Sequence, residues 1–319
     1  MIALFPDLAE HLRGVAEAIE EALRSEEPRV AALIAEIGSF HGKMLRPTLC
    51  LLCAEALGGA DRRHHRLAAA LELIHTATLV HDDLIDDADT RRGLPTLHLR
   101  FDNTTAVLIG DFLYTRAFTL AASLGDAALL ARLCQATNAV CEGELHQQMA
   151  ARDLTVDEAE YRRIAYGKTA ALTELAGWFG AIAGDAAQRA ACAAFGRDLG
   201  LAFQIVDDCL DLTGDAARVG KTLSTDLARG RMTLPIIRAL AAASAQQRAA
   251  LSARWQGAET PEALAEVRRL VVELGGVDSA WATARALAEG AVGRLEVLPD
   301  TPAREHLARL ACAVVDRDR

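Results

Sequence analysis

The chain has few aromatic residues and no proline over its long middle part. Aromatic residues make up 4% of the 319 residues, although 51% are hydrophobic. Proline is absent from 96–234, and runs of β-branched residues are scarce, while Ala, Leu, Glu and Arg are abundant. Such a composition favours long helices over strands. The sequence therefore predicts an all-α fold with a core built mainly of Ala and Leu.

Further absences exclude several classes of protein. No uninterrupted apolar run approaches the ~18 residues that a membrane span needs. The net charge of −10, without a Lys/Arg-rich stripe, argues against nucleic acid as the main partner. The N-terminal segment carries Asp7 and Glu10 and lacks the basic region of a signal peptide. We expect a cytoplasmic protein without a transmembrane segment, and, since the composition shows no boundary, a single domain over 1–319.

Cysteine pairing of the metal-binding kind is also missing. The chain has 7 cysteines, an odd number that fits a reducing compartment. Cys50 and Cys53 have the two-residue gap of a zinc pair, but no second pair accompanies them. We therefore interpret the cysteines as ordinary core or surface residues.

Two Asp-Asp-x-x-Asp clusters, each after an apolar stretch, are the most informative feature. They are Asp82, Asp83 and Asp86, and Asp207, Asp208 and Asp211. Residues four apart share a helix face, so the outer carboxylates of each cluster repel each other unless a cation intervenes. Carboxylate oxygens suit magnesium, which usually also binds substrate phosphates. One cluster could be a solvated face or a cap, but two with identical spacing predict a metal clamp for a diphosphate.

The first cluster ends a helix that we expect to begin near Arg66. One stripe of that helix would hold Leu71, His75, Thr78, Asp82 and Asp86. The stripe changes from apolar to anionic along its length, which predicts the wall of a deep pocket with a charged mouth.

Several cations and one amide accompany the clusters. Arg91 and Arg92 follow the first cluster and would either bind phosphate or balance the neighbouring acids. Gln204 shares a face with the second cluster and is either a neighbour of a carbocation or a core residue. Further candidates for phosphate contact are Lys43, Arg46, Lys221 and, beside an expected helix N-terminus, Lys168 and Thr169.

The order of these motifs matches a known family. They include Gly-Lys-Met-Leu-Arg-Pro at 42–47, the segment 75–86 with the first cluster, Gly-Lys-Thr-Ala at 167–170, and Phe-Gln-Ile-Val-Asp-Asp-Cys-Leu-Asp at 203–211. From about Gly42 to Pro235 the chain resembles the trans-isoprenyl diphosphate synthases, also called polyprenyl synthetases. The resemblance implies a bundle of roughly a dozen helices around a central cavity, usually in a homodimer.

The resemblance also implies roles for individual residues. Magnesium, about three ions per active site with substrate bound, would be held by Asp82, Asp86 and Asp207. Further or water-mediated contacts would come from Asp83, Asp208 and Asp211. Arg91 would bind the allylic diphosphate. The isopentenyl diphosphate site would comprise Lys43, Arg46, His75 and Arg92. Contact with the allylic substrate and the developing cation would come from Lys168, Thr169, Gln204 and Lys221, of which the first three would be catalytic.

The implied reaction is ionisation of the allylic carbon–oxygen bond, addition of isopentenyl diphosphate to the cation, and loss of a proton. Ala77 and Thr78, just before the first cluster, are small and would leave a product tunnel open. We therefore expect a medium or long all-trans polyprenyl diphosphate, with farnesyl or geranylgeranyl diphosphate as the alternative. A class I terpene cyclase, a head-to-head condensing enzyme and a non-catalytic prenyl-binding subunit are less favoured.

Three positions depart from the family pattern. His41 and Ser224 stand where glycine is frequent, and Arg231 stands where lysine is usual. Arg231 keeps the positive charge. Ser224 removes no ligand, so we expect it to affect the rate more than the type of reaction.

Overall fold

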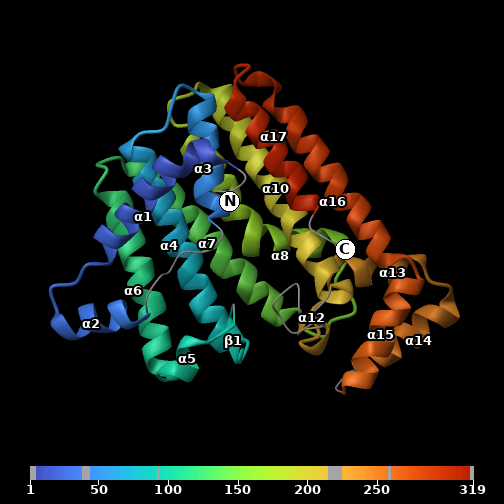
Figure 1. The fold of residues 1–319 in the computed structure, drawn as a ribbon. Coiled ribbons are helices and arrows are strands. Elements are labelled where there is room, and N and C mark those ends of the chain that lie inside the picture. The colour runs from blue at the N-terminus through green and yellow to red at the C-terminus, as the bar shows by residue number, and fades with distance from the viewer. Residues whose placement is uncertain (1–4, 38–43, 92, 215–224, 258–259, 317–319) are drawn as a thin grey trace. The chain divides into compact units, whose positions relative to one another are not determined.

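A computed structural model describes residues 5–37, 44–91, 93–214, 225–257 and 260–316 (Figure 1). Helices make up 81% of it, which confirms the all-α prediction. Strands in the described part are limited to one short antiparallel hairpin, formed by β1 (Thr90–Arg91) and β2 (Leu94–Pro95). None of the described helices combines the length and apolar character that crossing a membrane would require.

The chain is organised in two compact units. Unit 1 lies within 1–137, 172–196 and 294–307, and unit 2 lies within 138–171, 197–293 and 308–319. Each unit is thus built from separate stretches of sequence. The single-domain organisation over 1–319 stays a prediction.

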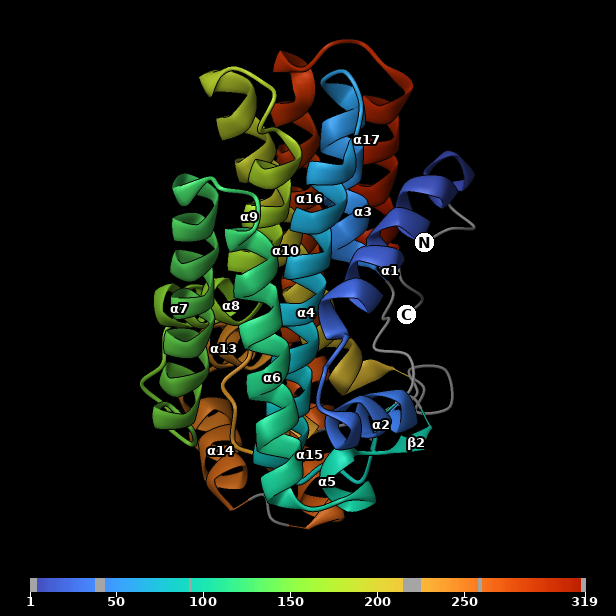
Figure 2. The ribbon, with the colours of Figure 1, turned by 90° about the vertical axis from the view of Figure 1, so that its left-hand side faces the viewer.

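Unit 1 is built around the helix that carries the first aspartate cluster, α4 (Arg62–Ile85). This helix packs along α6 (Asn103–Ala122), as Figure 2 also shows, and it contacts α1 and α3. The other elements are η1 (Pro6–Leu8), α1 (Ala9–Leu23), α2 (Pro28–Ile37), α3 (Leu45–Ala56), α5 (Leu97–Arg100), η3 (Arg294–Val297) and the greater part of α9 (Ala171–Gly180). It also takes the first parts of α7 (Ala127–Met149), α10 (Ala186–Thr213) and α17 (Pro302–Val315).

Helix α4 begins four residues before the predicted start at Arg66. Asp61 caps it, because the Asp61 carboxylate accepts the backbone N–H groups of Arg63 at 2.9 Å and His64 at 3.1 Å. The helix ends at Ile85, so the first cluster occupies its last turn and the residue that follows.

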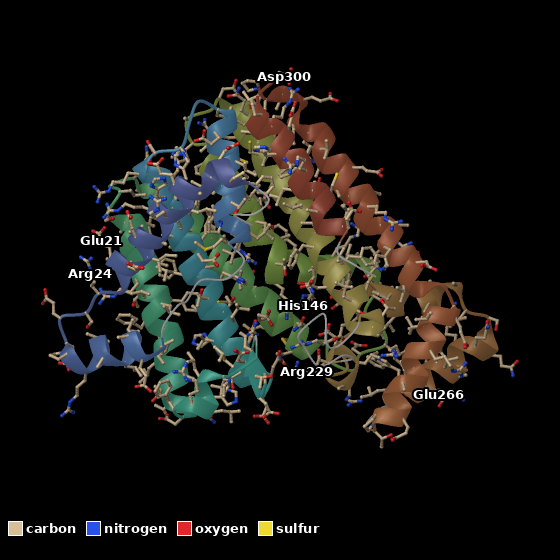
Figure 3. All side chains as sticks on the ribbon, viewed as in Figure 1. Glu21, Arg24, His146, Arg229, Glu266 and Asp300 are labelled. Carbon is tan, nitrogen blue, oxygen red and sulfur yellow. The ribbon has the colours of Figure 1, made fainter. Side chains whose placement is uncertain are left out.

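Unit 2 contains the later parts of α7, α10 and α17, together with a set of shorter helices. These are α8 (Glu158–Ala165), η2 (Tyr166–Ala170), α12 (Thr225–Ala228), α13 (Leu234–Ala242), α14 (Ala245–Gln256), α15 (Pro261–Glu273) and α16 (Gly276–Gly293). Helix α13 packs on α16, and α14 packs on α15. Glu266 of α15, labelled in Figure 3, accepts a hydrogen bond from Arg254 Nε of α14 at 2.7 Å.

Glycine permits the close crossing of α9 and α10 in unit 1. A Cβ atom on Gly177 would overlap the carbonyl oxygen of Cys192, and a Cβ atom on Gly196 would overlap that of Thr173. Each helix thus presents a glycine to the backbone of the other. Because backbone atoms cannot turn aside as a flexible side chain can, this packing requires glycine at both positions.

We expect Gly177→Ala to lower the free energy of unfolding by about 1–3 kcal/mol, since the helices must separate to admit a methyl group. Gly290→Ala is the control, because Gly290 is an exposed residue of α16 at which an added Cβ atom would meet no described atom within 4 Å beyond its own helix backbone. It should raise the free energy of unfolding by up to about 1 kcal/mol through helix propensity. Urea unfolding of both variants checks this, and equal effects would contradict it.

Candidate active site

The first cluster lies at the C-terminal end of α4, and its middle residue is held by an arginine. Asp83 is buried, and Arg91 of β1 donates from Nε to its Oδ1 at 2.8 Å and its Oδ2 at 2.7 Å. Arg91 Nη2 lies 2.6 Å from Asp83 Oδ1. Asp82 and Asp86 are half-buried. The structure thus pairs Arg91 with a neighbouring acid, and phosphate contact by Arg91 stays a prediction.

Burial along α4 follows the predicted stripe. Leu71 is fully buried, whereas His75, Thr78, Asp82 and Asp86 are half-buried. Apolar packing therefore gives way to accessible polar groups toward the C-terminal end of the helix.

Arg46, at the start of α3, is a buried cation in unit 1. Its exposed fraction is 8%, and its Nε has no hydrogen-bond acceptor within the described part of the chain. Burial lowers the pKa of the Arg46 guanidinium, and the charge of Glu72 opposes that shift. A guanidinium with an unused donor is costly to bury, so an anionic ligand would stabilise it.

The second cluster lies near the C-terminal end of α10, and its middle residue is again held by protein donors. Asp208 is buried, and its Oδ2 accepts the hydroxyl of Tyr161 at 2.6 Å, while its Oδ1 accepts Gln204 Nε2 at 2.8 Å. Asp207 and Asp211 are half-buried. The two clusters therefore share a pattern in which the middle aspartate is anchored and the outer two are more accessible.

Asp226, which sequence reasoning missed, is a further carboxylate beside the second cluster. Asp211 accepts the backbone N–H groups of Thr225 and Asp226, both at 3.1 Å, and so caps α12. Burial raises the pKa of Asp208 well above its ordinary value and raises the pKa of Asp211 to about 6, and the charge of Asp226 adds to both shifts. The signal for Asp226 was its place in the polar segment after Lys221.

An open pocket lies in unit 2, with an empty volume of about 480 Å³ that includes its mouth. Three predicted residues line it: Lys168, Gln204 and Asp208. The additional polar lining residues are Gln147, Tyr161, Asp226, Arg231 and Thr233. The structure thus brings together the predicted cation, the amide and one aspartate of the second cluster.

Lys168 and Thr169 lie in η2, a π-helical turn between α8 and α9, which together run continuously from Glu158 to Gly180. The prediction of a helix N-terminus at these residues is therefore wrong, because their backbone N–H groups lie inside a continuous helical segment. Gly167 of η2 and Gly143 of α7 face each other, and a Cβ atom on either would lie within 2.9 Å of the other's backbone. π-Helical turns are frequent at functional sites.

The close approach of η2 to α7 gives Lys168 an acidic neighbour. Lys168 Nζ lies 3.3 Å from Glu144 Oε1. The Gln147 amide is satisfied when its oxygen accepts from Lys168 Nζ at 3.1 Å and from Arg231 Nε at 3.1 Å. Glu144 and Gln147 were missed in the sequence, since only the glycine contact places them beside Lys168.

The departure at Arg231 has a structural explanation. Arg231 Nη1 lies 3.0 Å from Asp226 Oδ1, while Nε and Nη2 face the Gln147 oxygen. A guanidinium fork can bond both partners at once, which a single ammonium group does less well. Arginine at this position therefore links α7 to the start of α12.

The outer carboxylates of the two clusters suit a magnesium ion that also binds substrate phosphate. Within the described ranges, no three His, Cys, Asp or Glu side chains form a group that could hold a metal ion. In each cluster the two outer carboxylates are half-buried and one turn apart, and the middle one is buried and engaged by protein donors. Asp211 is half-buried although it also caps α12. Magnesium commonly takes one or two carboxylates and completes its shell with phosphate oxygens and water, which suits these residues.

Some predicted residues cannot be placed. Lys43, Arg92 and Lys221, together with His41 and Ser224, lie outside the described residues. Their roles stay predictions.

Comparison with known proteins supports the resemblance. The family model described as polyprenyl synthetase matches residues 27–274. The chain belongs to the polyprenyl synthetase family. The predicted family is thus confirmed, and with it a prenyltransferase.

This polyprenyl synthetase has relatives with products of different length. It is 39% identical to octaprenyl diphosphate synthase of Haemophilus influenzae over 96% of this chain and 94% of that one. It is 37% identical to a short chain isoprenyl diphosphate synthase of Methanothermobacter thermautotrophicus, over 95% of each chain. The crystal structure of a decaprenyl diphosphate synthase from Rhodobacter capsulatus matches with a TM-score of 0.91 and 38% identity, over 99% of each chain.

We expect Asp83→Asn to lower the free energy of unfolding by about 1–2 kcal/mol, because it weakens the charged hydrogen bonds to Arg91 in a buried position. Glu273→Gln is the control, since it removes one partner of the exposed pair formed with Arg269. That change should cost about 0.5 kcal/mol or less. Urea unfolding measures both, and equal losses would show that Asp83 is not an anchor.

Proposed function

We propose that this polyprenyl synthetase condenses an allylic diphosphate with isopentenyl diphosphate, head to tail, to give a medium or long all-trans polyprenyl diphosphate. The observation that carries the proposal is the same arrangement in both clusters, with an anchored middle aspartate between two more accessible ones. The similarity to octaprenyl and decaprenyl diphosphate synthases supports the product class.

Different residues would bind the metal and each of the two substrates. Asp82, Asp86 and Asp207 would hold magnesium, about three ions per site, which stabilises the charge on the departing diphosphate. Buried Arg46 would bind isopentenyl diphosphate together with Lys43, His75 and Arg92. Arg91 and Lys221 would bind the allylic diphosphate.

Residues in and beside the pocket of unit 2 would supply the groups for the cationic step. Lys168, now beside Glu144, would exchange that partner for a phosphate oxygen. Thr169 and Gln204, linked by a hydrogen bond of 2.6 Å, would present oxygen dipoles to the allylic cation. The double bond of isopentenyl diphosphate then attacks the cation, and the released diphosphate takes the proton that leaves. Exclusion of water keeps the cation from forming an alcohol.

The oligomeric state and the cellular location of the enzyme are also inferred from its sequence. We propose a homodimer, as the resemblance implies, and a cytoplasmic location, as the sequence predicts. Val107 and Leu108 support a partner surface, because these apolar residues of α6 are exposed at 40% and 61% in the single chain.

We expect the protein, incubated with magnesium, farnesyl diphosphate and labelled isopentenyl diphosphate, to make long linear prenyl chains. Asp82→Asn and Asp207→Asn should each lower kcat/KM by at least about a hundredfold, because each removes a ligand of the leaving-group metal. The control Asp87→Asn should keep full activity. Asp87 is fully exposed at φ 45°, a backbone conformation that asparagine tolerates. Chromatography of the dephosphorylated products measures all three.

The same incubation separates the alternatives. Cyclic hydrocarbon formed without consumption of isopentenyl diphosphate would indicate a terpene cyclase. Consumption of the allylic substrate in head-to-head dimers would indicate an enzyme of the squalene synthase type. No product with several allylic primers would favour a non-catalytic prenyl-binding subunit.

We expect Thr78→Phe to shorten the product by several isoprene units. Thr78 is half-buried on α4, one turn before Asp82, where an aromatic ring would obstruct the proposed tunnel. Thr78→Val, nearly equal in size, should leave the chain length unchanged. Chromatography of the labelled products compares the two, and identical length distributions would place the tunnel elsewhere.

A further inference from the structure

Four polar side chains of unit 2 form one continuous chain of hydrogen bonds. Tyr161 Oη donates to Asp208 Oδ2 at 2.6 Å, Gln204 Nε2 donates to Asp208 Oδ1 at 2.8 Å, and Thr169 Oγ1 donates to Gln204 Oε1 at 2.6 Å. Tyr161 comes from α8, Thr169 from η2, and the other two from α10. Tyr161 and Asp208 are buried, so these bonds form where water cannot easily replace them.

This chain decides which way the Gln204 amide points. The oxygen and nitrogen of an amide are nearly equal in size, so only the neighbouring donors and acceptors select the orientation. A carboxylate oxygen accepts from the NH2 group, and a hydroxyl donates to the carbonyl oxygen. Reversing the amide would place its oxygen against Asp208 Oδ1, where two acceptors would face each other, and would require the Thr169 hydroxyl to turn and accept from the NH2 group. The carbonyl oxygen of Gln204 is therefore fixed on the side of Thr169.

Tyr161 completes the arrangement from the other side of the carboxylate. Its hydroxyl donates to Oδ2, so each oxygen of Asp208 accepts from one side chain. The orientation of the carboxylate is therefore held by donors from both α8 and α10. Without the hydroxyl, Asp208 would keep a single side-chain donor among these residues and could rotate about its Cβ–Cγ bond. Gln204 would then lose the fixed acceptor that holds its NH2 group.

We propose that Tyr161 is a positioning residue for Gln204, acting through Asp208 to keep the amide oxygen directed at the developing allylic cation. The inference rests on the proposed function, in which Gln204 stabilises that cation. It also assigns Asp208 an anchoring role in place of metal ligation, which separates it from its neighbour Asp207. Tyr161 lines the pocket but acts through Asp208 in this scheme, so its contribution appears in the rate of ionisation more than in substrate binding.

The test is a double-mutant cycle of Tyr161→Phe and Gln204→Leu. For each protein we would measure kcat, the KM of both substrates and the magnesium concentration that gives half-maximal activity. We expect Tyr161→Phe to lower kcat about tenfold, with each KM and the magnesium requirement changed less than about twofold. In the Gln204→Leu background, Tyr161→Phe should change kcat less than about twofold. Thr137→Val, which removes a buried hydroxyl bonded within α7 of unit 1, should leave kcat unchanged.

Three results would overturn the inference. These are an unchanged kcat in Tyr161→Phe, an equal loss of kcat in both backgrounds, or a loss that appears in the magnesium requirement. Urea unfolding of the same four proteins gives a readout that does not depend on activity. The two substitutions should together change the unfolding constant by less than the product of their separate effects. If that coupling is found but the parent protein consumes no isopentenyl diphosphate, the proposed function fails while the hydrogen-bond chain stands.

Discussion

The concentration of carboxylates at the C-terminal ends of two long helices is the constraint on which the site depends. A helix C-terminus already carries partial negative charge, so aspartates there are unfavourable for the helix as well as for each other. The fold relieves part of this repulsion with its own donors. Arg91 pairs with Asp83, and Tyr161 and Gln204 bond Asp208. The outer aspartates are more accessible than the middle ones, and a metal–diphosphate complex could neutralise their charge.

Burial makes the ionised form of the carboxylates in the second cluster less favourable. Burial raises the pKa of Asp208 and of Asp211, and the negative charge of Asp226 adds to both shifts. Arg231 offsets some of it through Asp226 and at the same time bonds Gln147. The arginine found where the family usually has lysine therefore belongs to the electrostatic balance of the pocket.

The pocket also requires helices to approach one another closely, and glycine makes this approach possible. Glycine pairs let η2 lie against α7 and let α9 cross α10 without intervening side chains. The first contact places Lys168 beside Glu144 and Gln147, and the π-helical turn directs Thr169 toward Gln204. The chemistry of the pocket thus depends on positions that carry no functional group of their own.

The sequence by itself determined the helical class, the family and the two aspartate clusters, because composition, periodicity and repeated spacing are properties of the linear chain. It also suggested both roles of Arg91 without deciding between them. Only the tertiary structure showed that protein donors hold Asp83 and Asp208, and that Lys168 lies inside a continuous helical run. It also showed that Tyr161, Glu144, Gln147 and Asp226 lie beside the predicted residues. These facts depend on which side chains of distant segments meet at hydrogen-bond distance, and such contacts follow from packing that no local pattern encodes.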